Sequence, residues 1–94
     1  MTEKINLVER NNGGVVVYQN KGKSGEMTFS KAGETMLIIE HTEVNESLRG
    51  MGVGERLLDQ LVRYARANKL KVIPLCPFTK SVFEKKPEIR DVLK

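Results

Sequence analysis

The stretch Asn45-Glu-Ser-Leu-Arg-Gly-Met-Gly-Val-Gly54 joins an apolar run to the clearest helical pattern in the chain. Glycines occupy alternate positions at its end, where they let a ligand approach the backbone closely. The helix that follows exposes unpaired amide groups and the positive end of its dipole at this point, and both favour an anion. Arg49 adds a positive charge with a planar set of donors. The stretch therefore predicts a phosphate-binding loop between a strand and a helix.

The segments on either side of this loop predict a strand–helix–strand unit. Thr35–Val44 is apolar on both faces, which is typical of a central strand covered from both sides. Apolar residues recur at helical spacing over Val53–Ala65, and Asn68 is expected to end that helix. Lys71–Cys76 is expected to be a short strand that Pro77 ends. The whole unit is long enough for a crossover between parallel strands.

The rest of the chain predicts an antiparallel meander before this unit and short helices after it. Three strands are expected first, at Ile5–Leu7, Val15–Tyr18 and Glu26–Ser30. Between them, turns are expected at residues 11–14 and 31–34, with a polar loop at residues 19–25. After Cys76, Ser81–Lys85 is expected to be a short helix and Pro87 to begin a last turn. The expected fold class is α+β, with a mixed sheet.

Length and composition are those of one small globular domain. The chain has 94 residues, 39% hydrophobic and 30% charged, so a single domain over residues 1–94 is expected. The longest apolar run, Met36–Ile39, is far shorter than the ~20 residues of a membrane span. No signal peptide is expected after Met1. The lone cysteine, Cys76, cannot form an internal disulfide, which favours a cytoplasmic location.

Charge is distributed unevenly, although the net charge is only +4. Residues 1–46 contain 5 basic and 7 acidic residues, a net charge of −2, whereas residues 47–94 contain 11 and 5, a net charge of +6. The positive second half favours an anionic partner such as a nucleotide or a nucleic acid. An aromatic content of only 5% argues against base stacking, so nucleic acid is the less favoured partner.

Three other phosphate-binding or RNA-binding motifs fit this sequence poorly. The dinucleotide fingerprint needs a sixth-position glycine, and Glu55 stands there when the count starts at Gly50. Gly22-Lys-Ser24 matches the end of a P-loop, but Val17 replaces its leading glycine and no long helix follows. Gly22–Gly25 also fits the loop of KH domains, which joins two helices, whereas here it lies between predicted strands.

Arg49-x-x-Gly52-x-Gly54 resembles the acetyl-CoA signature of the GCN5-related N-acetyltransferase superfamily, Gln/Arg-x-x-Gly-x-Gly/Ala. Three neighbouring segments, His41-Thr-Glu-Val44, Pro74-Leu-Cys-Pro-Phe78 and Pro87-Glu88, are similar to a compact bacterial branch of that superfamily, whose members are about as long as this chain. The resemblance is dense over residues 41–93 and weak before them. It implies that two splayed strands admit the pantetheine arm of acetyl-CoA and that the loop binds its pyrophosphate.

The resemblance also implies the site residues. Cys76 and His41 would be catalytic, Cys76 near the thioester and His41 on the neighbouring strand. The cofactor-binding residues would be Glu43, Val44, Arg49, Gly50, Met51, Gly52, Val53 and Gly54. No metal is expected. Lys86 stands where members of the compact branch often have a histidine, and neither the helix pair that shapes the acceptor site in larger members nor their last two strands can be found.

The function expected is transfer of an acetyl group from acetyl-CoA to an amine that the sequence does not identify. His41 would accept a proton from the amine, directly or through water. Alternatively, Cys76 would relay protons or take the acetyl group itself as a nucleophile. Direct transfer is favoured, because the resemblance implies it for most of the superfamily and because no neighbour in the sequence clearly lowers the pKa of the Cys76 thiol. Two alternatives remain, a CoA-binding module without activity and a basic nucleic-acid-binding domain.

Overall fold

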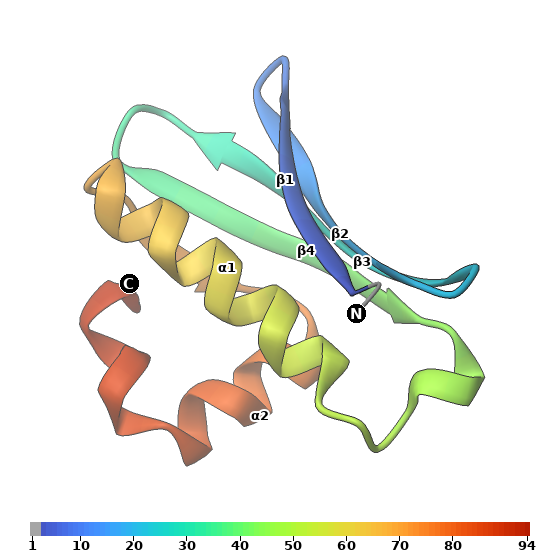
Figure 1. Cartoon of the computed structure of the whole chain (residues 1–94). Helices are drawn as coiled ribbons and strands as arrows, with labels where there is room; N and C mark the ends of the chain where they lie inside the picture. Colours follow the sequence, from blue (N-terminus) through green and yellow to red (C-terminus); the bar gives the residue numbers. More distant parts are fainter. Residues whose placement is uncertain (1–2) are drawn as a thin grey trace.

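A computed structural model describes residues 3–94 of the chain. Met1 and Thr2, where the expected domain begins, lie outside the described residues. In chain order (Figure 1) the elements are β1 (Lys4–Arg10), β2 (Gly13–Asn20), β3 (Lys23–Ala32), β4 (Met36–Val44), η1 (Glu46–Leu48), α1 (Val53–Ala67), β5 (Lys71–Pro74), α2 (Pro77–Lys85) and η2 (Pro87–Val92). The helices marked η are 3-10 helices.

The strands form one five-stranded sheet in the order β1-β2-β3-β4-β5. The first four pair antiparallel with their neighbours in the chain, whereas β4 and β5 pair parallel because α1 crosses between them. These pairings confirm the expected α+β fold, an antiparallel meander followed by a βαβ unit and short C-terminal helices. Asn68 caps the end of α1, as its position in the sequence predicts.

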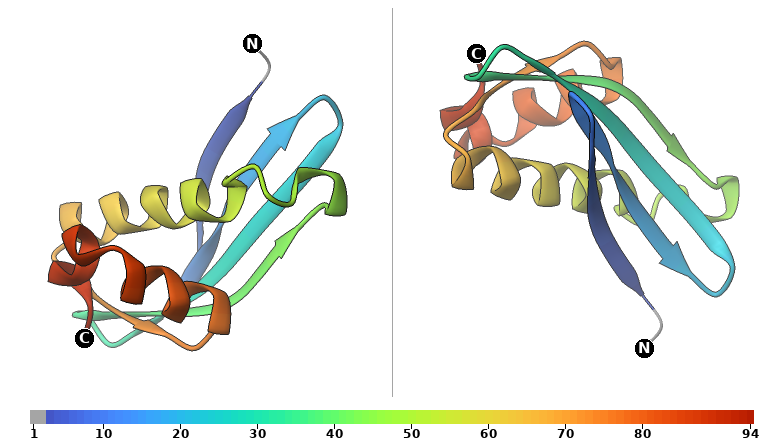
Figure 2. Two further views of the ribbon diagram at one scale, coloured as in Figure 1. Left: turned by 90° about the horizontal axis from the view of Figure 1, so that it is seen from below. Right: turned by 90° about the horizontal axis from the view of Figure 1, so that it is seen from above.

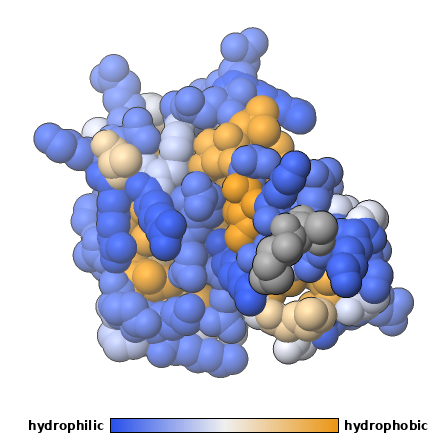
Figure 3. All heavy atoms as spheres, viewed as in Figure 1, coloured by the Kyte–Doolittle hydropathy of each residue, from blue (hydrophilic) through white to orange (hydrophobic). Residues whose placement is uncertain are grey.

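The helices pack on one side of the sheet (Figure 2), and the core lies between them and the inward-facing strand residues. Helix α1 buries its apolar stripe there, including Leu57, Leu58 and Leu61, while its outward side is hydrophilic (Figure 3). The expectation that β4 is covered on both faces is wrong, since Leu37 and Ile39 are buried but Ile38 between them is only half-buried. Within residues 3–94, no helix is long and apolar enough to cross a membrane.

The expected polar loop at residues 19–25 is mostly strand. Asn20 pairs with Lys23, and the two-residue turn between them has positive φ values of 52° at Lys21 and 79° at Gly22. Positive φ at both central positions is typical of the tight hairpin turns that match the twist of the strands. The polar side chains belong to strand ends that face solvent, and polarity alone therefore gave the wrong boundary.

The boundary between β5 and α2 also differs from the prediction. Strand β5 ends at Pro74, and Cys76 is the N-cap of α2 rather than the last residue of a strand. Pro77 is the first helical residue, a position that suits proline because the amide there needs no intrahelical acceptor. Helix α2 thus begins four residues earlier than the expected Ser81, and the thiol of Cys76 stands at a helix N-terminus.

A β-bulge in β4 determines which side chains point toward the helices. Thr28 pairs with His41 and Phe29 with Ile39, so Glu40 is an extra residue without a direct partner on β3. Beyond the bulge, the side chains of His41 and Glu43 point to the uncovered face of the sheet. The pairing of β4 with β5 ends at Ile39 and Pro74, so within residues 3–94 the last part of β4 has a strand partner on one side only.

The core placement of α1 can be tested by truncating one of its buried leucines. Leu57→Ala should lower the free energy of unfolding by about 2–5 kcal/mol, because it removes apolar contacts and leaves a cavity. The matched control is Val8→Ala on β1, where a 45% exposed side chain should cost less than about 1 kcal/mol. Urea denaturation followed by circular dichroism measures both. Equal losses in the two variants would contradict the assignment of Leu57 to the core.

Candidate functional site

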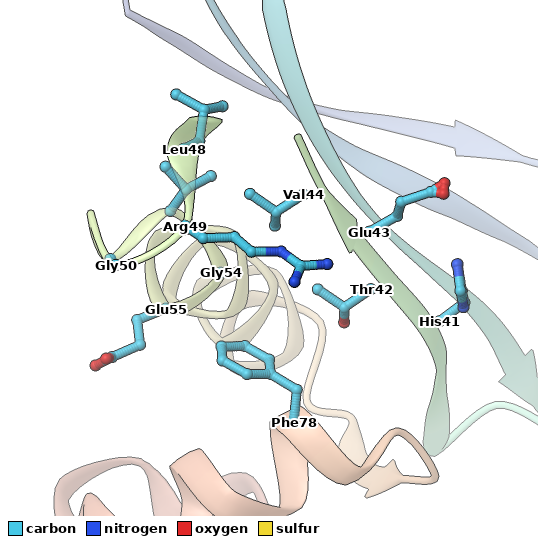
Figure 4. Close-up of a pocket in the computed structure, with 12 residues that line it drawn as sticks. His41, Thr42, Glu43, Val44, Leu48, Arg49, Gly50, Gly54, Glu55 and Phe78 are labelled. Atoms are coloured by element: carbon cyan, nitrogen blue, oxygen red, sulfur yellow. The ribbon is translucent and has the colours of Figure 1, made fainter. Parts of the chain in front are cut away.

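A cavity of about 660 Å³ lies where the end of β4, the glycine loop and the first residues of α1 and α2 meet (Figure 4). Its size is within the range of ordinary small-molecule sites. Eight of the ten site residues expected from the sequence line it: His41, Glu43, Val44, Arg49, Gly50, Gly52, Val53 and Gly54. Met51, which is exposed, and Cys76 do not. Four further residues line the cavity: Thr42, Leu48, Glu55 and Phe78.

The glycine loop presents unpaired amide groups to this cavity. Gly50 and Gly52 have positive φ values of 82° and 76°, a conformation that glycine adopts without strain. Gly52 is the N-cap of α1 and offers no side chain to its first turn. Within the described chain, no acceptor takes the amide hydrogens of Val53, Gly54 or Glu55. A group that binds here can satisfy these donors, and an anion suits them best.

Gly54 has a different role from the two glycines before it. A Cβ atom at this position would lie 2.5 Å from Cζ of the Phe78 ring. Glycine therefore lets the start of α1 pack closely against the start of α2, and the Phe78 ring forms one wall of the cavity (Figure 4). Gly54 therefore allows two helices to pack closely, whereas the sequence alone suggested that it gives space to the ligand.

Arg49 supplies the positive charge of the cavity. In Figure 4 its side chain extends from the loop across the cavity toward Thr42 and Phe78. No ion pair within residues 3–94 involves it, so its guanidinium group is available to an anionic ligand. The charge and the free amides of α1 therefore act on the same volume.

His41 lies on the other side of β4. Its backbone borders the cavity, but its side chain points away from Thr42 and toward the uncovered face of the sheet (Figure 4). Three exposed carboxylates share that face: Glu43 on β4, Glu26 directly opposite it on β3, and Glu40, which accepts a hydrogen bond from Ser30 at 3.1 Å. None of the three forms an ion pair within the described residues. This face therefore favours a positively charged group.

Cys76 is not one of the residues that line the cavity, but its side chain contacts Thr42, which is one of them. Its Sγ lies 3.5 Å from the Thr42 hydroxyl oxygen, between the separating ends of β4 and β5. Partial burial by itself raises the pKa of this thiol. The thiol donates to the Thr42 hydroxyl oxygen, and once the thiol is ionised this hydroxyl and nearby backbone amides, including that of Thr79, donate to the thiolate and outweigh the effect of burial. The pKa of Cys76 therefore lies below its ordinary value. The expectation that nothing local lowers it was wrong, because sequence spacing does not show that Thr42 and the start of α2 meet the thiol.

Within residues 3–94, side chains that could hold a metal ion do not gather in one place. Among residues 3–94, no group of three or more His, Cys, Asp or Glu side chains is arranged to bind one. The polar groups that converge on the cavity include amide hydrogens, one guanidinium group and one hydroxyl, which suit a phosphorylated organic ligand.

The sequence matches the family described as GCN5-related N-acetyl-transferase over residues 14–92. The chain belongs to this family, in agreement with the resemblance seen in its motifs. The solution structure of a GCN5-like protein from Staphylococcus aureus, classed as an N-acetyltransferase, is similar to it with a TM-score of 0.72 and 31% sequence identity. The match covers 95% of this chain and 87% of that one, so the two are of similar size.

Two larger proteins share the fold at lower identity. IAA acetyltransferase from Bacillus cereus matches with a TM-score of 0.66 and 20% identity, over 80% of this chain and 54% of that one. Glucosamine-6-phosphate N-acetyltransferase from Arabidopsis thaliana matches with a TM-score of 0.58 and 19% identity, over 80% and 58%. At these identities the likeness concerns the fold alone. A comparison with curated proteins found no match.

The environment of Cys76 predicts an unusually reactive thiol. Its alkylation by iodoacetamide should rise with pH at a midpoint below that of an ordinary cysteine, because only the thiolate reacts and its pKa is lowered. Thr42→Val removes the hydroxyl donor and should move the midpoint to higher pH. Thr28→Val, on the uncovered face of β3, is the control and should leave it unchanged. Mass spectrometry of the alkylated protein measures all three, and an unshifted midpoint in Thr42→Val would contradict the assignment.

Proposed function

We propose that this protein transfers an acetyl group from acetyl-CoA to an amine. The observation that carries the proposal is the set of free amides at the start of α1, which face the same cavity as the unpaired Arg49. Membership of the GCN5-related family makes acetyl-CoA the anionic ligand to expect there. The free amides of Val53, Gly54 and Glu55 and the Arg49 guanidinium group would bind the pyrophosphate, as helix N-termini and arginine side chains do elsewhere.

The end of β4 suits the pantetheine arm. Beyond Ile39, within residues 3–94, it has no strand partner on the side of β5, so the backbone groups on that edge are available for hydrogen bonds along the gap. An amide on this edge would also polarise the thioester carbonyl, which develops negative charge as the amine attacks. The main contribution of the fold is then to hold donor and acceptor in the right orientation.

The uncovered face of the sheet suits the acceptor. An amine is a cation until it loses a proton, and the carboxylates of Glu26, Glu40 and Glu43 favour a cation near His41. His41 is exposed on that face and would take the proton that leaves the ammonium group. The freed nitrogen then bonds to the carbonyl carbon, and the bond between that carbon and sulfur breaks. The acetyl group stays on the nitrogen, whose second proton is released, and the departing thiolate takes up a proton.

A second route is favoured by the lowered pKa of Cys76. The thiolate would attack the thioester, the acetyl group would move to Sγ with release of CoA, and the amine would then remove it. We favour direct transfer because His41, on the face open to solvent, provides the proton acceptor that direct transfer requires. Either route ends with the same products.

The two alternative functions predict different results. A CoA-binding module would bind acetyl-CoA without acetylating any amine. Nucleic-acid binding would need free cations, but Arg56 pairs with Glu3, and Arg66 pairs with Asp91 at 2.7 Å, so part of the positive charge on α1 is already neutralised. A cytoplasmic location would keep Cys76 reduced and supply acetyl-CoA, and we include it in the proposal.

Arg49→Ala tests the ligand assignment. It should weaken acetyl-CoA binding by about 1.5–3 kcal/mol, or roughly 10- to 150-fold, because charge-assisted hydrogen bonds to phosphate are lost. Binding of acetyl-pantetheine, which lacks the pyrophosphate, should change little. Isothermal titration calorimetry measures both. If the two ligands lose affinity equally, Arg49 acts through the fold and the pyrophosphate assignment is wrong.

His41→Ala and Cys76→Ala separate the two routes. Under direct transfer, His41→Ala should lower kcat by about 10²- to 10⁴-fold, the usual effect of losing a general base, while Cys76→Ser keeps substantial activity. Polyamines, amino sugars and lysine peptides serve as trial acceptors. Intact-mass analysis after incubation with acetyl-CoA alone should show no acetylated protein. An adduct that disappears in Cys76→Ala, and discharges to an amine at the turnover rate, would establish the covalent route instead.

A further inference from the structure

Lys86 joins the C-terminal segment to the start of α1. It stands between α2 and η2, where it is the C-cap of one helix and the N-cap of the other. Its Nζ lies 3.0 Å from Oε1 of Glu55 and 3.9 Å from Oδ1 of Asp59. These two carboxylates are one turn apart on α1, a spacing at which like charges repel. Lys86 is the one cation that pairs with either of them within residues 3–94.

The negative charge of the Glu55 carboxylate is unfavourable close to a phosphate. Glu55 is the third helical residue of α1, its amide is one of the free donors, and it is one of the residues that line the cavity. Besides it, Arg49 is the charged residue of the lining whose side chain extends across the cavity, since Glu43 points to the uncovered face of the sheet. The guanidinium charge of Arg49 is therefore cancelled by the negative charge of the Glu55 carboxylate. By itself that charge opposes an anionic ligand.

Lys86 removes this unfavourable charge. The hydrogen bond to Glu55 raises the pKa of Lys86 against the opposing effect of burial, so the amine stays protonated. The positive charge then lies within hydrogen-bonding distance of the carboxylate that borders the free amides of α1. Both side chains are partly exposed, so water and salt screen their charges. Loss of Lys86 should therefore lower the affinity for a phosphate moderately, without abolishing binding.

We infer that Lys86 is a positioning residue for the pyrophosphate of CoA: it holds and neutralises the Glu55 carboxylate, so that the start of α1 accepts an anion. This inference rests on the proposed function, since it concerns the same ligand and the same subsite. It assigns a role to a residue that stands outside the cavity lining and outside the glycine motif. Without Lys86, the Glu55 charge would act directly on the phosphates.

A purely mechanical role, in which Lys86 only ties η2 to α1, gives different expectations. Loss of a mechanical link would lower stability and weaken every ligand of the cavity alike. Loss of charge compensation would weaken only ligands that carry the pyrophosphate, and removal of the Glu55 charge would restore them. The comparison therefore needs two ligands, a double variant and a control at a neighbouring lysine.

The experiment measures the dissociation constants of acetyl-CoA and acetyl-pantetheine by isothermal titration calorimetry. Lys86→Met should weaken acetyl-CoA by about 3- to 5-fold, the scale of a partly exposed charge interaction, and leave acetyl-pantetheine within error. Glu55→Gln should tighten acetyl-CoA, and the double variant Lys86→Met/Glu55→Gln should return to the wild-type value or better. Lys86→Arg should keep wild-type affinity. Lys85→Met, which removes the same charge from an exposed neighbour, should have less effect than Lys86→Met.

Three results would overturn the inference while the proposed function stands. They are equal weakening of both ligands by Lys86→Met, a double variant no better than Lys86→Met alone, and an effect of Lys85→Met as large as that of Lys86→Met. Thermal denaturation of each variant shows whether it folds, and Lys86→Arg and Glu55→Gln test the same charge without removing the side chain. A wild-type protein that fails to bind acetyl-CoA would overturn the proposed function and this inference together.

Discussion

The separation of β4 and β5 is the constraint on which the site depends. Their parallel pairing ends at Ile39 and Pro74, and the chain then turns into α2 with Cys76 at its N-cap. The bulge at Glu40 places His41 on one face of β4, while the side chain of Thr42 meets the thiol of Cys76 in the gap. The gap therefore divides the site into a cavity under the helices and an exposed face on the opposite side of the sheet.

The charged groups of the site are also divided between the cavity and the uncovered face of the sheet. The cavity contains Arg49 and the free amides of α1, whereas the uncovered face presents Glu26 and Glu43 as direct cross-strand neighbours. Like charges placed opposite each other cost stability, so this pair does not serve the fold. In the proposed function, an anionic donor and a cationic acceptor approach from opposite sides and meet at the gap. The compensation of Glu55 by Lys86 belongs to the donor side.

Much of the fold could be predicted because its signals are local. Helical spacing and the glycine loop gave α1 and the βαβ unit, and the glycine motif together with residues 41–44 gave eight of the twelve residues that line the cavity. The sequence could not show whether Cys76 ends β5 or caps α2, because a proline at position 77 is equally suited to follow a strand and to begin a helix. The effect of Thr42 on the thiol and the pairing of Glu55 with Lys86 join residues more than 30 positions apart in the chain. Contacts of that kind follow from tertiary packing, which no pattern in the sequence reports.

The most direct test of the account is the amide NMR spectrum of the protein titrated with acetyl-CoA and, separately, with acetyl-pantetheine. The account predicts that acetyl-CoA produces its largest amide shifts at Val53, Gly54 and Glu55, whose hydrogens have no acceptor in the described chain. Acetyl-pantetheine should instead shift amides at the end of β4 and leave the start of α1 nearly unchanged. Absence of shifts at these three amides in the acetyl-CoA titration, with binding observed elsewhere, would contradict the central claim.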